Sequence, residues 1–285
     1  MNLQSIPDIV WSKLTKEAIV RRGQQGGVRP WVRSLFYEHI YSKWSEGKVD
    51  YSLNLADETD AGWDDLVVQW QAISGESPSM GAALKDQSVG KAFVQGFDDH
   101  TSARLWEKYN QKSRGDRFQF VVNSGGGMVL FNRMRRACQV YIKEKCAGDP
   151  GRSCVKGWKV FGEEKGMGRS DSCCVYTAVK YTDAGLTTLV ENYIWPQVKD
   201  LVDTDFKPLG FYSVCNKPLW AMPMPDPNRE KLVLGRESKG SAGGLMGNIL
   251  AKAYTEAIEK RYFFESGLTK LAQAEAKEIV EQLYA

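Results

Sequence analysis

The hydrophobic pattern of this chain changes its period along the sequence, and that change is the strongest constraint on its fold. Near the N-terminus, Val10, Leu14 and Ala18 recur at steps of four, as residues on one face of a helix do. A second helix is expected to begin at Pro30, a residue that is favoured in the first turn. Its apolar stripe consists of Val32, Phe36, Ile40 and Trp44. The N-terminal part is therefore expected to be helical.

From residue 117 onward, short strands are expected to alternate with helices. Three strands are expected, at Arg117–Val122, Val155–Phe161 and Ser172–Lys180. The first is followed by a helix to about Lys145. This order predicts an α+β fold, in which a helical N-terminal part packs on a small mixed or antiparallel sheet with flanking helices. The expected division is a helical subdomain at 1–112 and an α+β subdomain at 113–285, or else one continuous globular unit.

The segments between and after these strands carry weaker patterns. Residues 75–100 show no sustained period and are expected to form a long connection, and a loop with five prolines is expected at Pro208–Pro227. Asp183 is expected to cap a helix that Pro196 kinks. The closing helices are expected at Gly240–Tyr262 and Leu268–Leu283.

Composition excludes several classes of function. The chain has 285 residues and a formal net charge of +3, which argues against strong binding to nucleic acid or membranes. It has two histidines, His39 and His100, so a multi-histidine metal centre is excluded and neither a metal nor an organic cofactor is expected. Its six cysteines form no CxxC pair, which is typical of reduced thiols in a cytoplasmic protein. Catalysis would then depend on lysine, arginine and carboxylate side chains.

The hairpin between the second and third expected strands contains the most residues that could take part in catalysis or substrate binding. Alternation along the strand predicts that Val155, Gly157, Lys159 and Phe161 share one face. A lysine among apolar groups or other cations can serve as a base near neutral pH, so Lys159 is a candidate. The connection also carries Lys165, Arg169 and Asp171, which together could hold a phosphorylated substrate. An ordinary hairpin with charged surface residues is the alternative.

Two glycine- and hydroxyl-rich segments precede expected helices and could receive an anion. The first runs from Asn123 through three glycines. The second contains Arg236 and Ser238 ahead of a helix that begins near Gly243. Free N–H groups at a helix start bind anions, although a tight turn and a capped helix start explain the same residues.

Several of these segments, in the same order, resemble the HopA-type family of type III secretion effectors. That family includes the HopA-like phosphoserine/phosphothreonine lyases of class V lanthipeptide and thioamitide biosynthesis. The segment KVFGEEKGMGRSDSCCVYTA resembles the family pattern at Lys159, Arg169, Asp171 and Ser172. The resemblance covers roughly residues 29–45 and 117–252. Weaker matches lie at Arg33, Tyr37 and Tyr41, at Arg117 and Asn123, and in the segment RESKGS.

The resemblance implies elimination of phosphate from phosphoserine or phosphothreonine in a peptide or protein, which leaves a dehydroamino acid. Such a reaction needs a base for the α-proton and cations for the departing phosphate. Lys159 or Lys165 would be the base, and Asp171 would orient Arg169. The predicted substrate-binding residues are Arg117, Asn123, Arg169, Ser172, Arg236 and Ser238.

The chain departs from the family pattern at Gly243, where an arginine is expected, and at Met222–Pro225, which replaces an acidic pair. A catalytically inactive effector or scaffold that binds a host protein or a partner kinase is therefore the alternative. The protein is expected in the cytoplasm, or in a host cell if it is a delivered effector.

Overall fold

The computed structural model divides the chain into two compact units, which are described separately. The helical unit comprises Met1–Trp44, Pro208–Phe211 and Met222–Ala285, and the sheet unit comprises Ser45–Lys207 and Tyr212–Ala221. Both units combine residues from before and after position 112, and the predicted division there stays a prediction. The structure describes residues 3, 6, 8–21, 28, 32–33, 36, 82–83, 91–95, 104–109, 113–122, 127–161, 171–208, 210–238, 241–260 and 265–285.

The sheet unit is built on an eight-stranded sheet in the described part of the chain, with strand order β1-β2-β3-β5-β6-β4-β8-β7. The pairs β2·β3, β3·β5, β5·β6 and β4·β6, which form its middle, are all antiparallel. The strands are β1 (Ala82–Ala83), β2 (Lys91–Gln95), β3 (Arg104–Lys108), β4 (Arg117–Phe120), β5 (Val155–Phe161), β6 (Cys173–Thr177), β7 (Tyr212–Val214) and β8 (Lys217–Met222).

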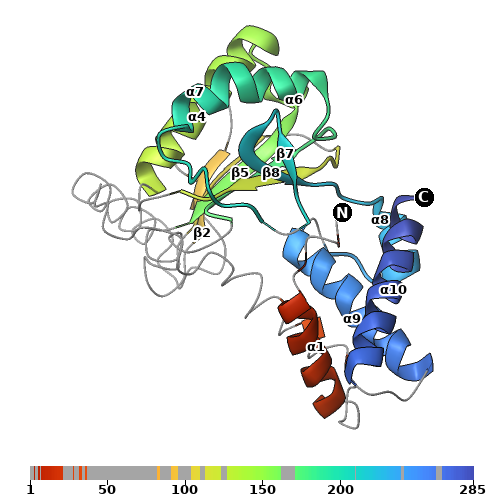
Figure 1. The fold of residues 1–285 in the computed structure, drawn as a ribbon. Coiled ribbons are helices and arrows are strands. Elements are labelled where there is room, and N and C mark those ends of the chain that lie inside the picture. The colour runs from red at the N-terminus through yellow and green to blue at the C-terminus, as the bar shows by residue number, and fades with distance from the viewer. Residues whose placement is uncertain are drawn as a thin grey trace. The chain divides into compact units, whose positions relative to one another are not determined.

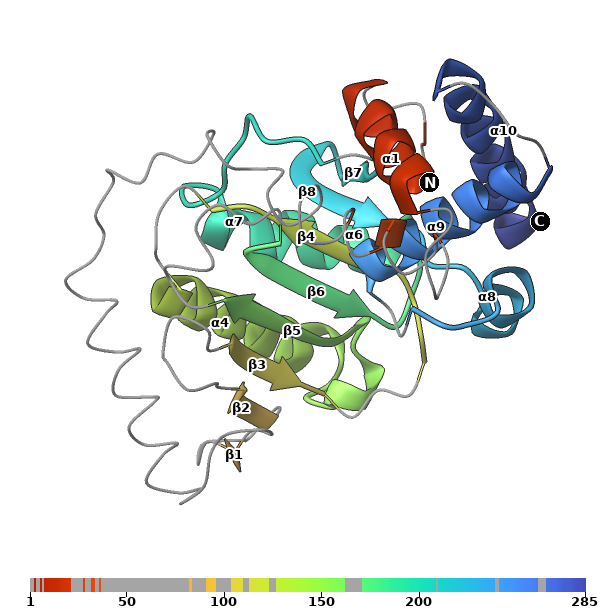
Figure 2. The ribbon, with the colours of Figure 1, turned by 90° about the horizontal axis from the view of Figure 1, so that it is seen from below.

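Helices cover one face of this sheet (Figures 1 and 2). They are α4 (Gly127–Lys145), α6 (Ala184–Leu189), the π-helical turn η5 (Val190–Ile194) and α7 (Trp195–Val198), and a short 3-10 turn, η4 (Pro150–Arg152), precedes β5. Phe118, Trp158 and Val175 from the strands are fully buried against Leu130 and Met134 of α4. The predicted α+β class is confirmed, and burial of these apolar side chains is the main contribution to its stability.

The predicted cap at Asp183 is confirmed, and the helix that follows changes its winding ahead of Pro196, which was expected to kink or break it. Asp183 caps α6, since its Oδ1 accepts the backbone N–H groups of Gly185 and Leu186. The helix then widens into η5 directly ahead of Pro196 in α7. Proline has no N–H to donate and its ring crowds the preceding turn, which accounts for the local widening.

Two expected loops are wrong. Residues 75–100 contain β1 and β2, each of five residues or fewer. Strands this short show no local pattern and are stabilised by pairing with neighbouring strands. The proline-rich segment contains the hairpin of β7 and β8. Its turn is formed by Cys215 and Asn216, both with positive φ. The prolines in this segment obscured the hairpin because proline is rare inside strands.

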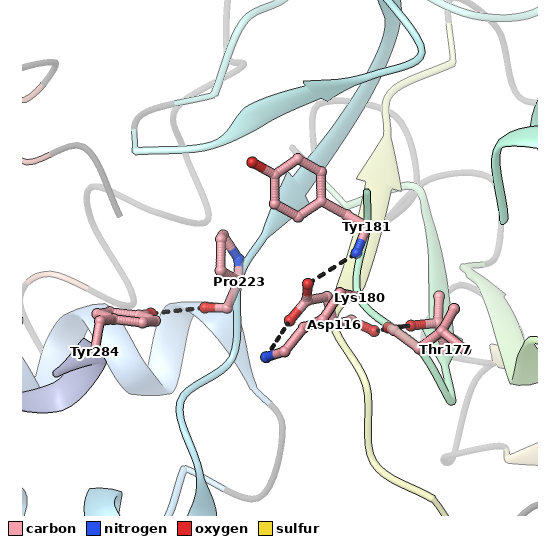
Figure 3. Close-up of polar contacts among 7 residues, drawn as sticks. Asp116, Thr177, Lys180, Tyr181, Pro223 and Tyr284 are labelled. Atoms are coloured by element: carbon pink, nitrogen blue, oxygen red, sulfur yellow. Dashed lines mark hydrogen bonds and ion pairs between the residues drawn. The ribbon is translucent and has the colours of Figure 1, made fainter. Parts of the chain in front are cut away.

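The helical unit contains α1 (Asp8–Arg21), α8 (Pro227–Leu234), α9 (Ala242–Lys260) and α10 (Glu265–Tyr284). Thr15 of α1 joins three of these helices, because its hydroxyl lies 2.8 Å from the Tyr254 hydroxyl and 2.7 Å from the Thr269 hydroxyl. The end of α10 is held by the Tyr284 hydroxyl, which donates to the carbonyl of Pro223 (Figure 3). The other N-terminal helices expected from the sequence lie mostly outside the described residues.

Candidate functional site

The face of the sheet opposite α4 carries polar side chains from four neighbouring strands. In the register, Lys159 of β5 lies between Trp106 of β3 and Cys174 of β6, and Cys174 lies opposite Gln119 of β4. Arg117 lies opposite Tyr176. Residues directly opposite in a ladder point to the same side, so these side chains share one surface. We call this set, Trp106, Arg117, Gln119, Lys159, Cys174 and Tyr176, the polar face.

Arg117 is the most strongly held cation of the polar face. Its side chain is buried, and its Nη2 donates to Oε1 of Gln119 at 2.7 Å. The same nitrogen lies 3.7 Å from Oδ2 of Asp171, and the guanidinium lies 5.9 Å from the ring centre of Tyr176. An amide, a carboxylate and an aromatic ring therefore fix the plane of this guanidinium, which suits it to bind a planar or tetrahedral anion.

Asp171 links Arg117 to the start of β6. The side chain is buried, and the thiol of Cys174 lies 3.7 Å from both its Oδ2 and its backbone oxygen. The sequence predicted that Asp171 would orient Arg169, which lies outside the described residues. The structure places Asp171 beside Arg117, so this carboxylate can orient a different arginine of the predicted set.

Lys159 lies on the same surface, beside an aromatic pair. Its exposed fraction is 8%, and its Nζ lies 5.8 Å from the ring centre of Trp106. The Trp106 ring stacks on Tyr176 at 5.5 Å with an interplanar angle of 19°, although β5 separates their strands. Gly157 of β5 lies opposite Tyr176 and Lys108, where it has no side chain to separate the two rings. The stack therefore crosses β5 at Gly157, from β3 to β6, next to Lys159.

The start of β4 is fixed by Asp116, the residue before Arg117 (Figure 3). Its buried carboxylate accepts from the ammonium of Lys180 at 3.3 Å and from the backbone N–H of Tyr181 at 2.9 Å. Its carbonyl oxygen accepts from the hydroxyl of Thr177 at 2.7 Å. These bonds tie β4 to the segment after β6 and so hold Arg117 at its place in the sheet.

One expected feature of β5 is wrong. Val155 does not share a face with Gly157 and Lys159, because it belongs to the apolar core under α4. The register shifts between Val155 and Gly157, which pair with the adjacent residues Thr177 and Tyr176. Such a bulge adds one residue to one strand and reverses the side to which the preceding side chains point.

The other predicted site residues are distributed as follows. Ser172 is buried next to Asp171 at the start of β6. Arg236 and Ser238 belong to the helical unit, between α8 and α9, and both are half-buried. Asn123, Lys165 and Arg169 lie outside the described residues, as do both histidines.

Four residues of the polar face were missed by the sequence analysis. Gln119 was detectable, because polar Arg117 and Gln119 alternate with Phe118 and Phe120 along β4. Cys174 can be placed on the face opposite to Cys173, because adjacent strand residues point to opposite sides, but nothing local indicated its partners. Trp106 and Tyr176 come together only through the pairing of β3, β5 and β6, which the sequence does not reveal.

The core side contains a buried carboxylate with a shifted pKa. Glu107 of β3 is fully buried, and it accepts from the Tyr109 hydroxyl at 2.9 Å and pairs with Nε of Arg135 at 3.1 Å. Burial raises the pKa of Glu107, while its contacts with Tyr109 and Arg135 oppose that shift. This group faces away from Lys159 and is a structural ion pair between β3 and α4.

The buried thiols whose pKa is shifted are poor nucleophiles. Burial raises the pKa of Cys154 to about 11, and it also raises the pKa values of Cys138 and Cys173. A thiol is reactive as a thiolate, so these three groups are unreactive near neutral pH. In the described part of the chain, no three histidine, cysteine or carboxylate side chains are placed to hold a metal ion. No helix in that part is long and apolar enough to span a bilayer.

Comparison with known proteins gives few matches. No family model matches the sequence, and no curated protein matches it. The structure resembles an effector protein from Pseudomonas syringae pv. tomato strain DC3000, with a TM-score of 0.48 and 13% identity over 94% of this chain and 93% of that chain. It also resembles an effector protein from Pseudomonas syringae pv. syringae strain 61, with a TM-score of 0.48 and 15% identity over 94% of this chain and 92% of that chain. Likeness at this level establishes neither a family nor an activity.

Proposed function

We propose that the protein eliminates phosphate from phosphoserine or phosphothreonine in a peptide or protein. The observation that carries this proposal is the polar face, where buried Arg117 and Lys159 lie on one side of the sheet. They occupy β4 and β5, two strands apart, so their backbones are separated by roughly 10 Å. Both side chains are long enough to reach a phosphorylated residue between them. The sequence resemblance to the HopA-type lyases supports the same chemistry.

Each residue has a defined part in this reaction. The unprotonated amine of Lys159 removes the α-proton of the phosphorylated residue, and the electron pair of that C–H bond forms the double bond to the β-carbon. The bond from the β-carbon to the phosphate oxygen breaks, and phosphate leaves with its electron pair. Arg117 binds the phosphate as its charge increases, while Asp171 and Gln119 hold the guanidinium in place.

The burial of these groups favours a binding role over a purely structural one. Burying cations is costly, since they lose hydration that a neighbouring carboxylate repays only in part. A sheet face that only needed to be covered would carry apolar residues, as the face under α4 does. Two buried cations on one face of a sheet are therefore typical of an anion-binding site.

The test is a phosphothreonine peptide incubated with the purified protein and followed by mass spectrometry. The parent should remove phosphoric acid from the peptide, and Lys159→Ala should slow this by roughly a hundredfold to ten-thousandfold, as expected for a lost general base. Lys143→Ala is the matched control, because Lys143 is an exposed lysine of α4, the helix on the opposite face of the sheet. Equal rates for Lys159→Ala and the parent would remove Lys159 from this role.

A second candidate is a catalytically inactive protein that binds a host protein or a partner kinase. The observation that favours it is Gly243, which lies in the first turn of α9 where the resemblance predicts an arginine. In this case the parent and Lys159→Ala would both leave the phosphopeptide unchanged. For the lyase, the phosphorylated residue must come from a kinase reaction, in the cytoplasm or in a host cell that receives the protein.

A further inference from the structure

Asn248 of α9 is a buried amide without a hydrogen-bond partner among the residues that the structure describes. Its exposed fraction is 1%, and neither its Oδ1 nor its Nδ2 is paired in the structure. An amide buried without partners is unfavourable by more than a typical hydrogen bond contributes, so such groups are rare unless a ligand satisfies them. The side chain is thus a candidate for binding a molecule at α9.

The direction of the Asn248 side chain follows from helix geometry. Side chains on a helix lean toward its N-terminus, so the amide covers the turn that contains Gly244, four residues earlier. Gly244 has no side chain, and a Cβ placed there would lie 3.2 Å from the Ser241 side chain and 3.7 Å from Cβ of Ser238. Ser241 and Ser238 therefore lie beside Gly244, on the turn toward which the Asn248 side chain leans.

The hydroxyl of Ser238 is a second polar group at this place. Its Oγ is buried and has no hydrogen-bond partner in the structure. The backbone around it is fixed, because the N–H of Ser238 donates to Glu230 and its carbonyl accepts from the N–H of Ser241 at 3.0 Å. Gly235, with a φ of 70°, provides the left-handed turn by which the chain leaves α8.

The start of α9 supplies positive potential at the same place. Ser241 caps this 19-residue helix, since its Oγ accepts the N–H of Gly244 at 3.2 Å and its carbonyl accepts the N–H of Leu245 at 2.8 Å. The first N–H groups of a helix have no partner within it, and the helix dipole makes this end partly positive. Arg236 lies two residues before Ser238 and adds a formal charge to the same segment.

We infer that Ser238, Asn248 and the first turn of α9 form a binding site for a phosphate group. The amide of Asn248, the hydroxyl of Ser238 and the N–H groups at the start of α9 that Ser241 does not accept are three kinds of donor, which suits the tetrahedral oxygens of phosphate better than a flat carboxylate. The phosphate can be the phosphoryl group of the substrate or the ion released by elimination. Only the choice between these two sources rests on the proposed function, since binding itself requires no reaction.

The test is isothermal titration of the full-length protein with inorganic phosphate, and with acetate as the flat carboxylate. Phosphate should bind to the parent and acetate should not. Asn248→Leu should weaken phosphate binding at least tenfold. Thr255→Val is the matched control, because Thr255 lies two turns further along the same helix and its hydroxyl donates to Ala251. Absent phosphate binding, equal binding by Asn248→Leu, or preferred acetate binding would each overturn the inference.

A second variant separates lost binding from lost folding. Gly244→Ala places a methyl group between Ser238 and Ser241, and alanine is the better helix former. We expect its thermal midpoint to be maintained while phosphate binding falls at least tenfold. Retained phosphate binding by a folded Gly244→Ala would contradict the inference.

The source of the phosphate is distinguished by a phosphothreonine peptide in the same titration. Tighter binding of the peptide than of phosphate, lost in Asn248→Leu, assigns the site to the substrate. Binding of free phosphate alone assigns it to the released ion. Lys159→Ala should abolish elimination but leave phosphate binding intact, so a failed lyase assay with intact binding refutes the proposed function and not this site.

Discussion

The two faces of the central strands differ in polarity, although the same strands form both. On one face, Phe118, Phe120 and Trp158 are fully buried against helices. On the other, Arg117, Gln119 and Lys159 are almost equally buried but polar. Alternation along β4, and along β5 from Gly157 onward, produces this contrast. It indicates that the apolar face supplies the stability that buried cations on the polar face reduce.

The largest effect is expected on the apolar face. Trp158→Ala removes a fully buried ring whose centre lies 4.7 Å from that of Phe131. The free energy of unfolding should fall by about 3–5 kcal/mol, measured by urea denaturation. A loss below about 1 kcal/mol would mean that this face contributes much less than its burial indicates.

The next effect tests the stacked pair of the polar face. In Gly157→Ala, the new Cβ would lie 2.5 Å from the carbonyl oxygen of Glu107, so β3 must move and carry Trp106 with it. We expect a loss of about 1–3 kcal/mol in urea denaturation. The environment of Trp106 should also change, as seen by fluorescence in comparison with a Trp106→Phe background. An unchanged stability would contradict the close packing of β3 on β5.

A pair of neighbouring substitutions separates the two faces most sharply. Gln119→Leu removes the acceptor of Arg117, and the rate of phosphate elimination should fall about tenfold with little change in stability. Phe118→Leu, one residue earlier, should cost about 1 kcal/mol of stability and leave the rate unchanged. If both variants lost stability and activity in parallel, the two faces would not have separate roles.

The smallest effect concerns Glu107, the charged exception on the apolar side. Burial raises its folded-state pKa above the ordinary value of 4.5, so the folded protein holds a proton that the unfolded chain releases just above pH 4.5. Stability therefore decreases as pH rises through that window. Glu107→Gln should reduce the change in the free energy of unfolding across this pH range by about 1 kcal/mol or less, measured by urea denaturation at several pH values. A parent that gains Glu107-dependent stability with rising pH would contradict the direction of the shift.

The strands that form the centre of the site were predictable from sequence, but their neighbours were not. Alternation and short apolar runs located β4 and β5, and adjacency alone placed Cys173 and Cys174 on opposite faces. The pairing of β3 with β5 joins residues about fifty positions apart, which no local pattern records. The bulge at Val155 was missed because an added residue leaves the apolar pattern almost unchanged.

The unpaired amide of Asn248 was equally invisible in the sequence. An asparagine in an apolar helix is compatible with many partners, and its lack of one appears only when the packing is known. Ser238 was predicted as a substrate ligand, but no pattern in the sequence connects it with a residue ten positions later. The link between them is the absent side chain of Gly244.

The polar face is proposed to eliminate phosphate from phosphothreonine, rather than to hydrolyse the phosphate ester or only to bind it. The most direct measurement is the mass of the product from a phosphothreonine peptide treated with the parent protein. Elimination predicts a dehydroamino acid, whose mass is one water below that of the hydrolysed threonine peptide, and a later thiol addition should modify it. A product with intact threonine, or an unchanged phosphopeptide, would contradict the account.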